Sequence, residues 1–347
     1  MLPDLTAQLT QGVGLSDSQT RLAIDLLIRE DICVETKAEF LRALARKGET
    51  PEEIAGFARV LRDRAVRPPL DDATRQREIL DVCGTGGDHQ NTFNISTTVA
   101  LIAAAAGVTV AKHGNRAITS QSGSADVLEE LGIPIDLTPE RASAALRDFG
   151  FAFFFAPNYH PAFKHIGAAR KLCSATGQRT IFNFLGPLLN PVAPSAQLIG
   201  VPAPDLCRPL AQVLQSLGVR RGMIVCGRAG TGFLDEVSSL GETSVAEFYQ
   251  AHALSLSSLI PDSFDLPPHS LVDLVGGTRE TNAQIIRDIL SGRETGPKLH
   301  AALLNAGAAL FVVGRCRSIL EGLEIATDVI RSGAAAAKLQ QLSRSRV

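Results

Sequence analysis

The first 66 residues repeat their apolar positions at helical spacing, as at Leu22, Ala23 and Leu26. Three candidate helix caps precede such runs, each a Ser or Thr three residues ahead of a Gln or Glu. They are Ser16 with Gln19, Thr36 with Glu39, and Thr50 with Glu53. The pattern predicts a small all-helical unit, followed by a charged, proline-bearing linker at residues 67–76.

From residue 78 the pattern changes to short β-rich runs separated by stretches with helical spacing, each of which ends at a glycine suited to close a helix. The predicted strands are 78–83, 108–114, 133–137, 151–157, 196–202 and 222–227. The predicted helices are 97–107, 124–132, 139–150 and 205–218. This alternation predicts an α/β domain with a mostly parallel central sheet flanked by helices, in which ligands bind at the carboxyl ends of the strands.

Three longer stretches stand apart from this alternation. Residues 160–191 contain a basic helix and a segment with glycine and proline, and they can rejoin the N-terminal helical unit. Residues 271–292 and 319–342 have the amphipathic spacing of helices that pack against a core.

The composition is that of a globular protein, since 45% of the 347 residues are hydrophobic. The 34 basic and 36 acidic residues nearly balance, which argues against a broad nucleic-acid surface and makes any anion site local.

The N-terminus lacks the features of a signal peptide, and the longest apolar run, 97–111, is too short to cross a bilayer. We therefore expect a cytoplasmic protein. The six cysteines have no spacing suited to zinc.

The sequence GTGGD at residues 84–88 stands between a predicted strand and a helix start marked by NIST at residues 94–97. Glycine lets the backbone approach a ligand closely, and the first N–H groups of a helix favour an anion, so the loop predicts a phosphate site. It lacks the Gly-Lys-Ser/Thr ending of a P-loop and the glycine spacing of a dinucleotide fingerprint. Taken alone, it is equally consistent with a tight turn before a capped helix.

A second glycine-bearing loop follows the next predicted strand. Its glycines are Gly114 and Gly123, and the polar side chains around them are Lys112, His113, Asn115, Arg116, Ser120 and Ser124. Two consecutive strand-to-helix loops of this composition, one of them with three potential cations, are hard to explain by folding alone. They predict two walls of one polyphosphate site at the same edge of the sheet.

Asp235 and Glu236 form an acidic pair within FLDEVS, residues 233–238, after the predicted strand 222–227. Adjacent acidic residues are most often solvated surface charges. Beside a phosphate site, however, carboxylates after a strand are suited to hold the magnesium that diphosphates require. The pair is therefore a candidate metal site.

These motifs closely resemble those of the anthranilate phosphoribosyltransferase family of the tryptophan pathway. The matching segments occur in family order and are GTGGD (84–88), NIST (94–97), KHGNR (112–116), SGSADVLEELG (122–132), FAPNYHPAFKH (155–165), RTIFNFLGPLLNP (179–191) and LDEVS (234–238). Three departures stand out. Ala168 and Ala169 occupy the usual Pro-Val positions before Arg170, and GTGFLDE is longer than the usual Gly-x-Asp-Glu. Gln121 stands where family members often have a basic or different residue.

The resemblance implies transfer of the phosphoribosyl group of 5-phosphoribosyl 1-diphosphate (PRPP) to the amine of anthranilate, with release of diphosphate. Its implied cofactor is Mg²⁺, with two ions per active site. The implied partners are these small molecules and a second copy in a homodimer, with no nucleic acid and no membrane.

The implied fold is the nucleoside phosphorylase-like phosphoribosyltransferase architecture. In this chain it corresponds to a small helical domain of residues 1–68 plus about 162–190, which forms the dimer interface. The larger α/β domain, which binds PRPP, corresponds to residues 76–161 plus 191–347.

The resemblance also assigns site residues by their place in the motifs. The PRPP positions are Gly84, Gly87, Asp88, Thr92, Asn94, Ile95, Ser96, Thr97, Lys112, His113, Gly114, Asn115, Arg116, Ala117, Ile118, Thr119, Ser120 and Ser124. The anthranilate positions are Gly84, Asn115 and Arg170. The metal positions are Ser96, Asp235 and Glu236, and the catalytic candidates are Lys112, His113 and Arg170.

The implied chemistry needs no Ser-His-Asp or Cys-His group, because negative charge builds on the departing diphosphate, where a metal ion and Lys112 can stabilise it. Arg170 is expected to pair with the anthranilate carboxylate. His113 is either a proton acceptor for the amine or a hydrogen-bonding wall residue. The wall is favoured, because the anilinium formed is acidic enough to lose its proton to water.

Two alternatives stay open from the sequence. A pyrimidine nucleoside phosphorylase shares the architecture, but its phosphate loop has a different glycine pattern and its chain usually extends further. A non-catalytic relative that binds PRPP or nucleic acid would not need Asp235, Glu236 and Arg170.

Overall fold

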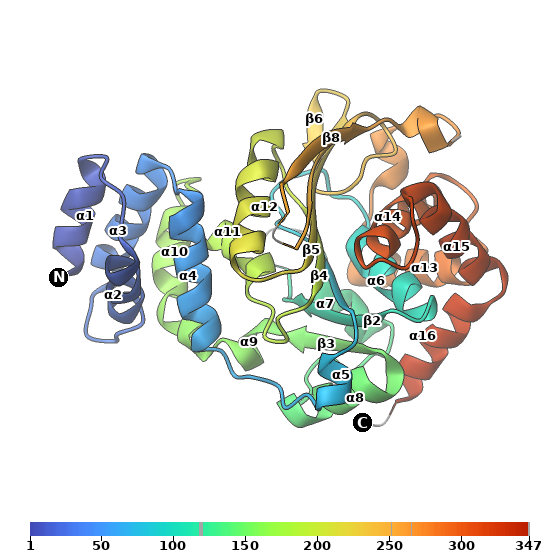
Figure 1. Cartoon of the computed structure of the whole chain (residues 1–347), viewed down its shortest axis with the longest axis horizontal. Coiled ribbons are helices and arrows are strands. Elements are labelled where there is room, and N and C mark those ends of the chain that lie inside the picture. Colours follow the sequence, from blue (N-terminus) through green and yellow to red (C-terminus); the bar gives the residue numbers. More distant parts are fainter. Residues whose placement is uncertain (118–120, 251, 265, 346–347) are drawn as a thin grey trace.

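The computed structural model describes residues 1–117, 121–250, 252–264 and 266–345. It consists of an N-terminal helical domain and a larger α/β domain, which agrees with the predicted fold class. Figure 1 shows the first four helices at one end of the long axis and the sheet with its covering helices at the other. None of the described helices has the length and apolar character needed to cross a membrane.

The N-terminal domain begins with α1 (Leu2–Thr10), α2 (Asp17–Leu27), α3 (Val34–Lys47) and α4 (Pro51–Asp63). Two predicted capping boxes are confirmed, since Ser16 and Thr50 each accept a hydrogen bond from the backbone N–H three residues on. The prediction of a cap at Thr36 is wrong. Cys33 already has the extended backbone of an N-cap, so α3 starts at the next residue, Val34, and Thr36 falls inside its first turn.

Two helices from the middle of the chain pack on this domain. Helix α10 (Gly167–Ser174) contacts α3, and α11 (Phe182–Leu188) contacts α4. Lys37 donates to the His165 carbonyl at 3.0 Å, and Arg62 donates to the Leu188 carbonyl at 2.5 Å. The assignment of residues 162–190 to the helical domain stays a prediction, which these contacts support.

The α/β domain is built on an eight-stranded sheet. Its strands are β1 (Ile79–Gly84), β2 (Thr109–Gly114), β3 (Phe151–Phe155), β4 (Ala196–Gly200), β5 (Arg221–Ala229), β6 (Gly232–Leu234), β7 (Thr243–Tyr249) and β8 (Ser255–Leu259). The order is β3-β2-β1-β4-β5-β7-β8, with β6 paired to β5, and the strands from β3 to β5 in this order are parallel. The carboxyl ends of β1, β2 and β4 therefore lie side by side.

Two features of the sheet differ from the sequence-based prediction. Residues 133–137 form no strand, because Pro134 cannot donate to a ladder, and their alternating apolar side chains are buried in an irregular segment instead. Strands β6, β7 and β8 are absent from the prediction, and all three pair in antiparallel fashion. Strand β8 is an almost fully exposed edge, so it lacks the apolar alternation that marks a half-buried strand.

Helices cover both faces of the sheet. The remaining α-helices are α5 (Asp72–Arg75), α6 (Ile95–Ala105), α7 (Ser124–Glu130), α8 (Pro139–Phe149), α9 (Ala156–Tyr159), α12 (Cys207–Ser216), α13 (Arg279–Leu290), α14 (Pro297–Val312), α15 (Ile319–Arg331) and α16 (Ala334–Arg344). The 3₁₀ helices are η1 (Pro161–His165), η2 (Pro204–Leu206), η3 (Pro261–Phe264) and η4 (Leu271–Leu274).

Alternate residues of β4 and β5 contribute to two separate cores. Leu198 and Met223 belong to the core that contains α6 and α14, whereas Ile199 and Ile224 belong to the core that contains α12 and the N-terminal helices. Figure 1 accordingly places α12 between the sheet and the helical domain, and α6 and α14 on the other side. The helical domain thus shares one apolar cluster with residues of β4, β5 and β7, whereas Ala111 of β2 and Phe154 of β3 belong to a third cluster.

The two long amphipathic stretches are less continuous than predicted. Residues 271–292 contain η4 and α13, separated by Gly276 and Gly277. Residues 319–342 are split between α15 and α16 at Gly333, whose φ of 76° lies in the left-handed region.

Candidate active site at the carboxyl edge of the sheet

The two glycine loops start at the same edge of the sheet, because β1 and β2 are adjacent parallel strands that end at Gly84 and Gly114. The first loop leads into α6, and the second leads into α7. Asn94 links them, since its Nδ2 donates to the Ser122 carbonyl at 3.2 Å. The structure therefore brings the two predicted walls together.

Asp235 lies against the first glycine loop. Its Oδ2 accepts the Gly86 N–H at 2.7 Å, and a Cβ atom on Gly84 would come within 2.3 Å of the same oxygen. Only glycine at position 84 leaves room for this carboxylate. Asp88 faces it from the loop, and its Oδ2 accepts the Asp235 N–H at 3.4 Å. The longer GTGFLDE segment forms the β5–β6 turn and β6, so Asp235 still follows directly after a strand.

Glu236 is only 8% exposed, and negative charge accumulates around it. Burial and the neighbouring Asp235 raise the pKa of Glu236 well above its ordinary value, whereas Lys112 and the Ser96 backbone N–H act to lower it. Burial, with a further contribution from Asp88, raises the pKa of Asp235 to about 7. Without a bound cation, too little positive charge therefore lies nearby to balance the ionised carboxylates of Asp235 and Glu236.

This donor set fits a hard divalent cation. Carboxylate and hydroxyl oxygens are the ligands that magnesium prefers, and Asp235, Glu236 and Ser96 supply both. Among the described residues, no three His, Cys, Asp or Glu side chains form a ready-made metal cage. An ion held here would need water and substrate oxygens to complete its shell, which is the usual habit of magnesium.

Lys112 is 1% exposed and lies beneath the site. Its Nζ donates to the Val82 carbonyl at 2.7 Å and to the Ser96 Oγ at 3.4 Å. Burial lowers the pKa of Lys112, and the negative charge of Asp81 is the main opposing influence. The ammonium group thus contacts Ser96, a predicted metal ligand, and its direct action on diphosphate stays a prediction.

His113 lies on the other side of the same strand, in a buried polar network. Its backbone N–H donates to Asp81 Oδ1 at 3.3 Å, and Asp81 Oδ2 accepts from Asn190 Nδ2 at 2.9 Å. Nδ1 lies 3.3 Å from the Gly186 carbonyl, which can only accept, so the proton is assigned to Nδ1. Burial, with a smaller effect of His160, lowers the pKa of His113 to about 3. The imidazole is therefore neutral at physiological pH.

A row of rings connects His113 with Arg170. The ring centroids of His113 and His160 are 5.3 Å apart, those of His160 and Phe163 are 5.3 Å apart, and those of Phe163 and Phe182 are 5.6 Å apart. The Arg170 guanidinium carbon lies 5.3 Å from the centroid of Phe182. The structure thus places a row of two imidazole and two phenyl rings, packed mostly edge to face, between the end of β2 and the Arg170 guanidinium.

Arg170 sits in the first turn of α10, which starts at Gly167 despite the two alanines that replace Pro-Val. Burial lowers the pKa of Arg170, and among the described residues no carboxylate opposes this shift. A half-buried guanidinium without a protein counter-ion is suited to bind an anionic ligand.

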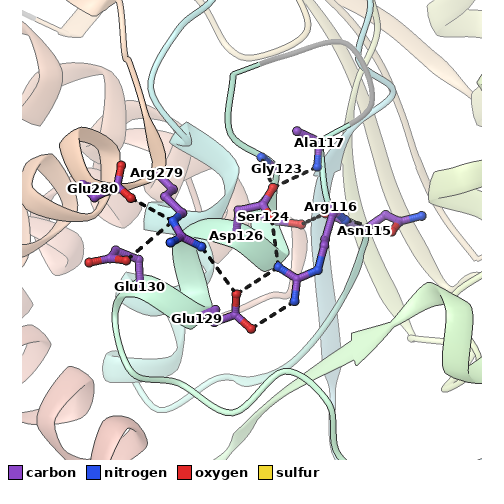
Figure 2. Close-up of polar contacts among 10 residues, drawn as sticks. All are labelled: Asn115, Arg116, Ala117, Gly123, Ser124, Asp126, Glu129, Glu130, Arg279 and Glu280. Carbon is purple, nitrogen blue, oxygen red and sulfur yellow. Dashed lines mark hydrogen bonds and ion pairs between the residues drawn. The ribbon is translucent and has the colours of Figure 1, made fainter.

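Arg116 has a different environment from the one predicted. Figure 2 shows its guanidinium turned toward α7, where it donates to Glu129 at 2.9 and 3.0 Å and to Asp126 at 3.0 Å. Its assignment as a PRPP ligand stays a prediction, and these ion pairs would compete with phosphate for the guanidinium.

The remaining predicted positions lie along the two loops. Gly87 has a φ of 88°, Thr92 bridges to Val275, and Ile95 and Thr97 are buried in the first turn of α6. The predicted ligands Ile118, Thr119 and Ser120 lie outside the described residues.

Two further side chains that support the loops escaped the sequence-based prediction. Arg179 donates to the Gly87 carbonyl at 2.9 Å, and Asn282 donates to Asn94 Oδ1 at 2.9 Å. They lie 92 and 188 residues from their partners, so no local pattern reveals them. Asp81, by contrast, does leave a signal, as the only charged residue inside the apolar run 79–83.

Two family models match the chain. The model described as "Glycosyl transferase family, helical bundle domain" matches residues 3–65, and the one described as "Glycosyl transferase family, a/b domain" matches residues 76–336. The chain is 44% identical over 353 residues to the anthranilate phosphoribosyltransferase of Geobacter sp. (strain M21). The alignment covers 99% of this chain and 98% of that protein. Its identity to the protein of the same name from Methanosphaerula palustris is 44% over 342 residues, with the same coverage.

Solved structures agree with these matches. The crystal structure of anthranilate phosphoribosyltransferase from Thermus thermophilus has a TM-score of 0.87 at 38% identity and covers 98% of both chains. The Saccharomyces cerevisiae enzyme in complex with PRPP and Mg has a TM-score of 0.87 at 28% identity and covers 98% of this chain and 96% of its own.

Proposed function

The chain belongs to the family of anthranilate phosphoribosyltransferases, and we propose that the site at the carboxyl edge of its sheet carries out their reaction. The protein transfers the phosphoribosyl group of PRPP to the amine of anthranilate and releases diphosphate, a magnesium-dependent step of L-tryptophan biosynthesis. The observation that best supports this placement is the acidic pair, held against one glycine loop and linked by Ser96 and Lys112 to the strand that begins the other.

The diphosphate of PRPP would lie between the two glycine loops, where backbone N–H groups and the first turn of α6 favour an anion. Asp235, Glu236 and Ser96 would hold magnesium beside it. Bound there, the ion supplies positive charge that stabilises the departing diphosphate. Three carboxylates, those of Asp88, Asp235 and Glu236, carry more negative charge next to a diphosphate than one divalent ion balances, which supports the proposal of two ions.

Anthranilate would lie along the rings between His113 and Phe182, with its carboxylate on Arg170 and its amine directed toward Gly84 and Asn115. The amine is neutral at physiological pH and can attack without prior loss of a proton. The residues of this chain therefore act mainly by orientation, which converts the attack into an effectively unimolecular step.

His113 is expected to serve as a wall of this pocket rather than as a base. With a pKa of about 3, its imidazole is too weak a base to drive proton transfer near neutral pH. The variant His113→Ala should keep kcat within about tenfold of the parent, with no change in the pH profile between pH 6 and about 9. Steady-state rates across this range measure both quantities. A loss of kcat beyond about a hundredfold would identify His113 as the base.

Magnesium binding is expected to strengthen about tenfold between pH 6 and about 8. The pKa of Asp235 is raised to about 7 when no cation is present, so an ion that binds below this pH must displace a proton. Above it, the carboxylate is already ionised. Calorimetric titration of the protein with MgCl₂ at three pH values measures the affinity, and two buffers of different ionisation enthalpy count the protons released. Equal affinity across the range would contradict a raised pKa.

We also propose a homodimer formed through the helical domain, residues 1–68 plus about 162–190. Val13, Leu22 and Leu172 on this domain are exposed at 52%, 44% and 38%, so the domain has apolar side chains that such a contact could bury. A role in amino-acid biosynthesis supports the proposed cytoplasmic location.

The alternative functions, a pyrimidine nucleoside phosphorylase or a non-catalytic binding protein, gain no support, because the relatives and structures above are named as anthranilate phosphoribosyltransferases.

Phosphorus NMR of a mixture of the protein, PRPP, anthranilate and MgCl₂ tests the proposed chemistry. One diphosphate should appear for each PRPP consumed, and its formation should require anthranilate. Equal diphosphate release without anthranilate would show hydrolysis instead of transfer.

A further inference from the structure

Asp126 joins the two ends of the second glycine loop. A single oxygen, Oδ2, accepts the N–H groups of Ala117 and Gly123, each at 2.9 Å, as Figure 2 shows. The bond to Gly123 is the ordinary reach-back contact at the start of a helix. The bond to Ala117 spans nine residues, and no helix requires it. Asp126 therefore does more than cap α7.

The backbone on both sides of these bonds is in close contact. We call residues 115–117 and 122–125 the neck of the loop. A Cβ atom on Gly123 would come within 2.4 Å of the Ala117 nitrogen, so the neck closes only because residue 123 is glycine. The Asn115 carbonyl accepts the Ser124 hydroxyl at 3.4 Å and the Ala125 N–H at 3.3 Å. The neck thus holds four of the proposed PRPP positions, Asn115, Arg116, Ala117 and Ser124.

The ion pairs around the neck are a weaker restraint than the bonds inside it. Arg116 and Glu129 are each 45% exposed, and Arg279 on α13, 3.9 Å from Glu129, is 50% exposed. Exposed pairs of this kind are screened by solvent and contribute little. The Asp126 side chain is only 18% exposed, and its bonds are made to backbone groups that cannot move away without opening the neck.

The first glycine loop also contacts the neck. Asn94, at the start of α6, donates to the Ser122 carbonyl and is itself held by Asn282. The neck is therefore fixed from α7 by Asp126 and from the first glycine loop by Asn94. Its geometry determines how the second wall faces the first.

We propose that Asp126 is a positioning residue for PRPP binding: by closing the neck, it sets the places of Asn115, Ala117 and Ser124 relative to the first glycine loop. The inference rests on the proposed function, because it names a support for that same site. Asp126 touches no substrate in this arrangement and acts through the backbone of the neck.

Steady-state kinetics of three variants test this role. Asp126→Ala should raise the KM for PRPP about tenfold while leaving the KM for anthranilate within about threefold. Asp126→Asn keeps an oxygen that can accept both N–H groups and gives up only the contact of Oδ1 with the exposed Arg116 guanidinium, so its KM for PRPP should stay within about threefold of the parent. Glu129→Gln removes charge from the Arg116 pair but leaves the neck bonds in place, and it should also stay within about threefold.

Three kinetic results would overturn the proposal: an unchanged KM for PRPP in Asp126→Ala, an equal defect in Asp126→Asn, or an equal defect in Glu129→Gln. A parent protein with no activity would instead count against the proposed function itself. If Asp126→Ala does not fold, hydrogen exchange of the parent protein decides the question. The Ala117 and Gly123 amides should then exchange at least about tenfold more slowly than in an unstructured peptide of the same sequence, and unprotected amides would contradict a closed neck.

Discussion

Replacing Asp235 with asparagine should lower kcat/KM for PRPP by about a thousandfold. The carboxylate lies against Gly84 and accepts the Gly86 N–H, so the variant keeps its shape and loses only its charge. Without that charge, magnesium is held less firmly where negative charge builds on the diphosphate. Rates measured at several MgCl₂ concentrations separate weaker metal binding from a slower chemical step.

Glu242→Gln provides the matched control for this variant. Glu242 follows Asp235 by seven residues and is exposed to solvent, so its neutralisation should leave kcat/KM within about twofold. Near-normal activity of Asp235→Asn at saturating PRPP and low magnesium would remove Asp235 from the metal site.

Replacing Arg170 with alanine should raise the KM for anthranilate about thirty- to a hundredfold, with a change of less than about threefold for PRPP. The guanidinium stacks on Phe182, is half-buried, and is opposed by no carboxylate among the described residues. It is thus ready to form a bidentate pair with the substrate carboxylate. Arg170→Lys should recover only part of the loss, because an ammonium group cannot reproduce the paired geometry or the stacking.

Lys171→Ala controls for the loss of positive charge on α10. Lys171 is the next residue and is exposed, so its removal should change neither KM appreciably. If the Arg170 and Lys171 variants raised both KM values by the same small amount, Arg170 would lie outside the anthranilate site.

The sequence predicts the parallel part of the fold well, because each of β1 to β5 is a short apolar run bounded by turn residues or glycine-ended helices. The sequence-based prediction fails where contacts with distant parts of the chain determine the local structure. Residues 133–137 have the burial pattern of a strand but include a proline that cannot pair, and β8 pairs without any apolar alternation. Thr36 resembles a cap, yet the backbone of Cys33 starts the helix first.

Part of the candidate site was likewise predictable from the sequence, and part was not. Glycine loops and an acidic pair leave local signals, so Gly84, Ser96 and Asp235 could be found along the chain. The supports of the site come from distant segments: Gly186 is 73 residues from His113, and Asn282 is 188 residues from Asn94. Burial also changes chemistry in ways that no motif records, as the lowered pKa of His113 and the raised pKa of Asp235 show.

The most direct test of the proposed site is the loss of anthranilate fluorescence after PRPP and MgCl₂ are added to the purified protein. Fluorescence should fall at a rate proportional to protein concentration, and the fall should stop when PRPP is omitted or magnesium is chelated. Steady fluorescence in the complete mixture, with a related active enzyme as positive control, would contradict the proposed reaction.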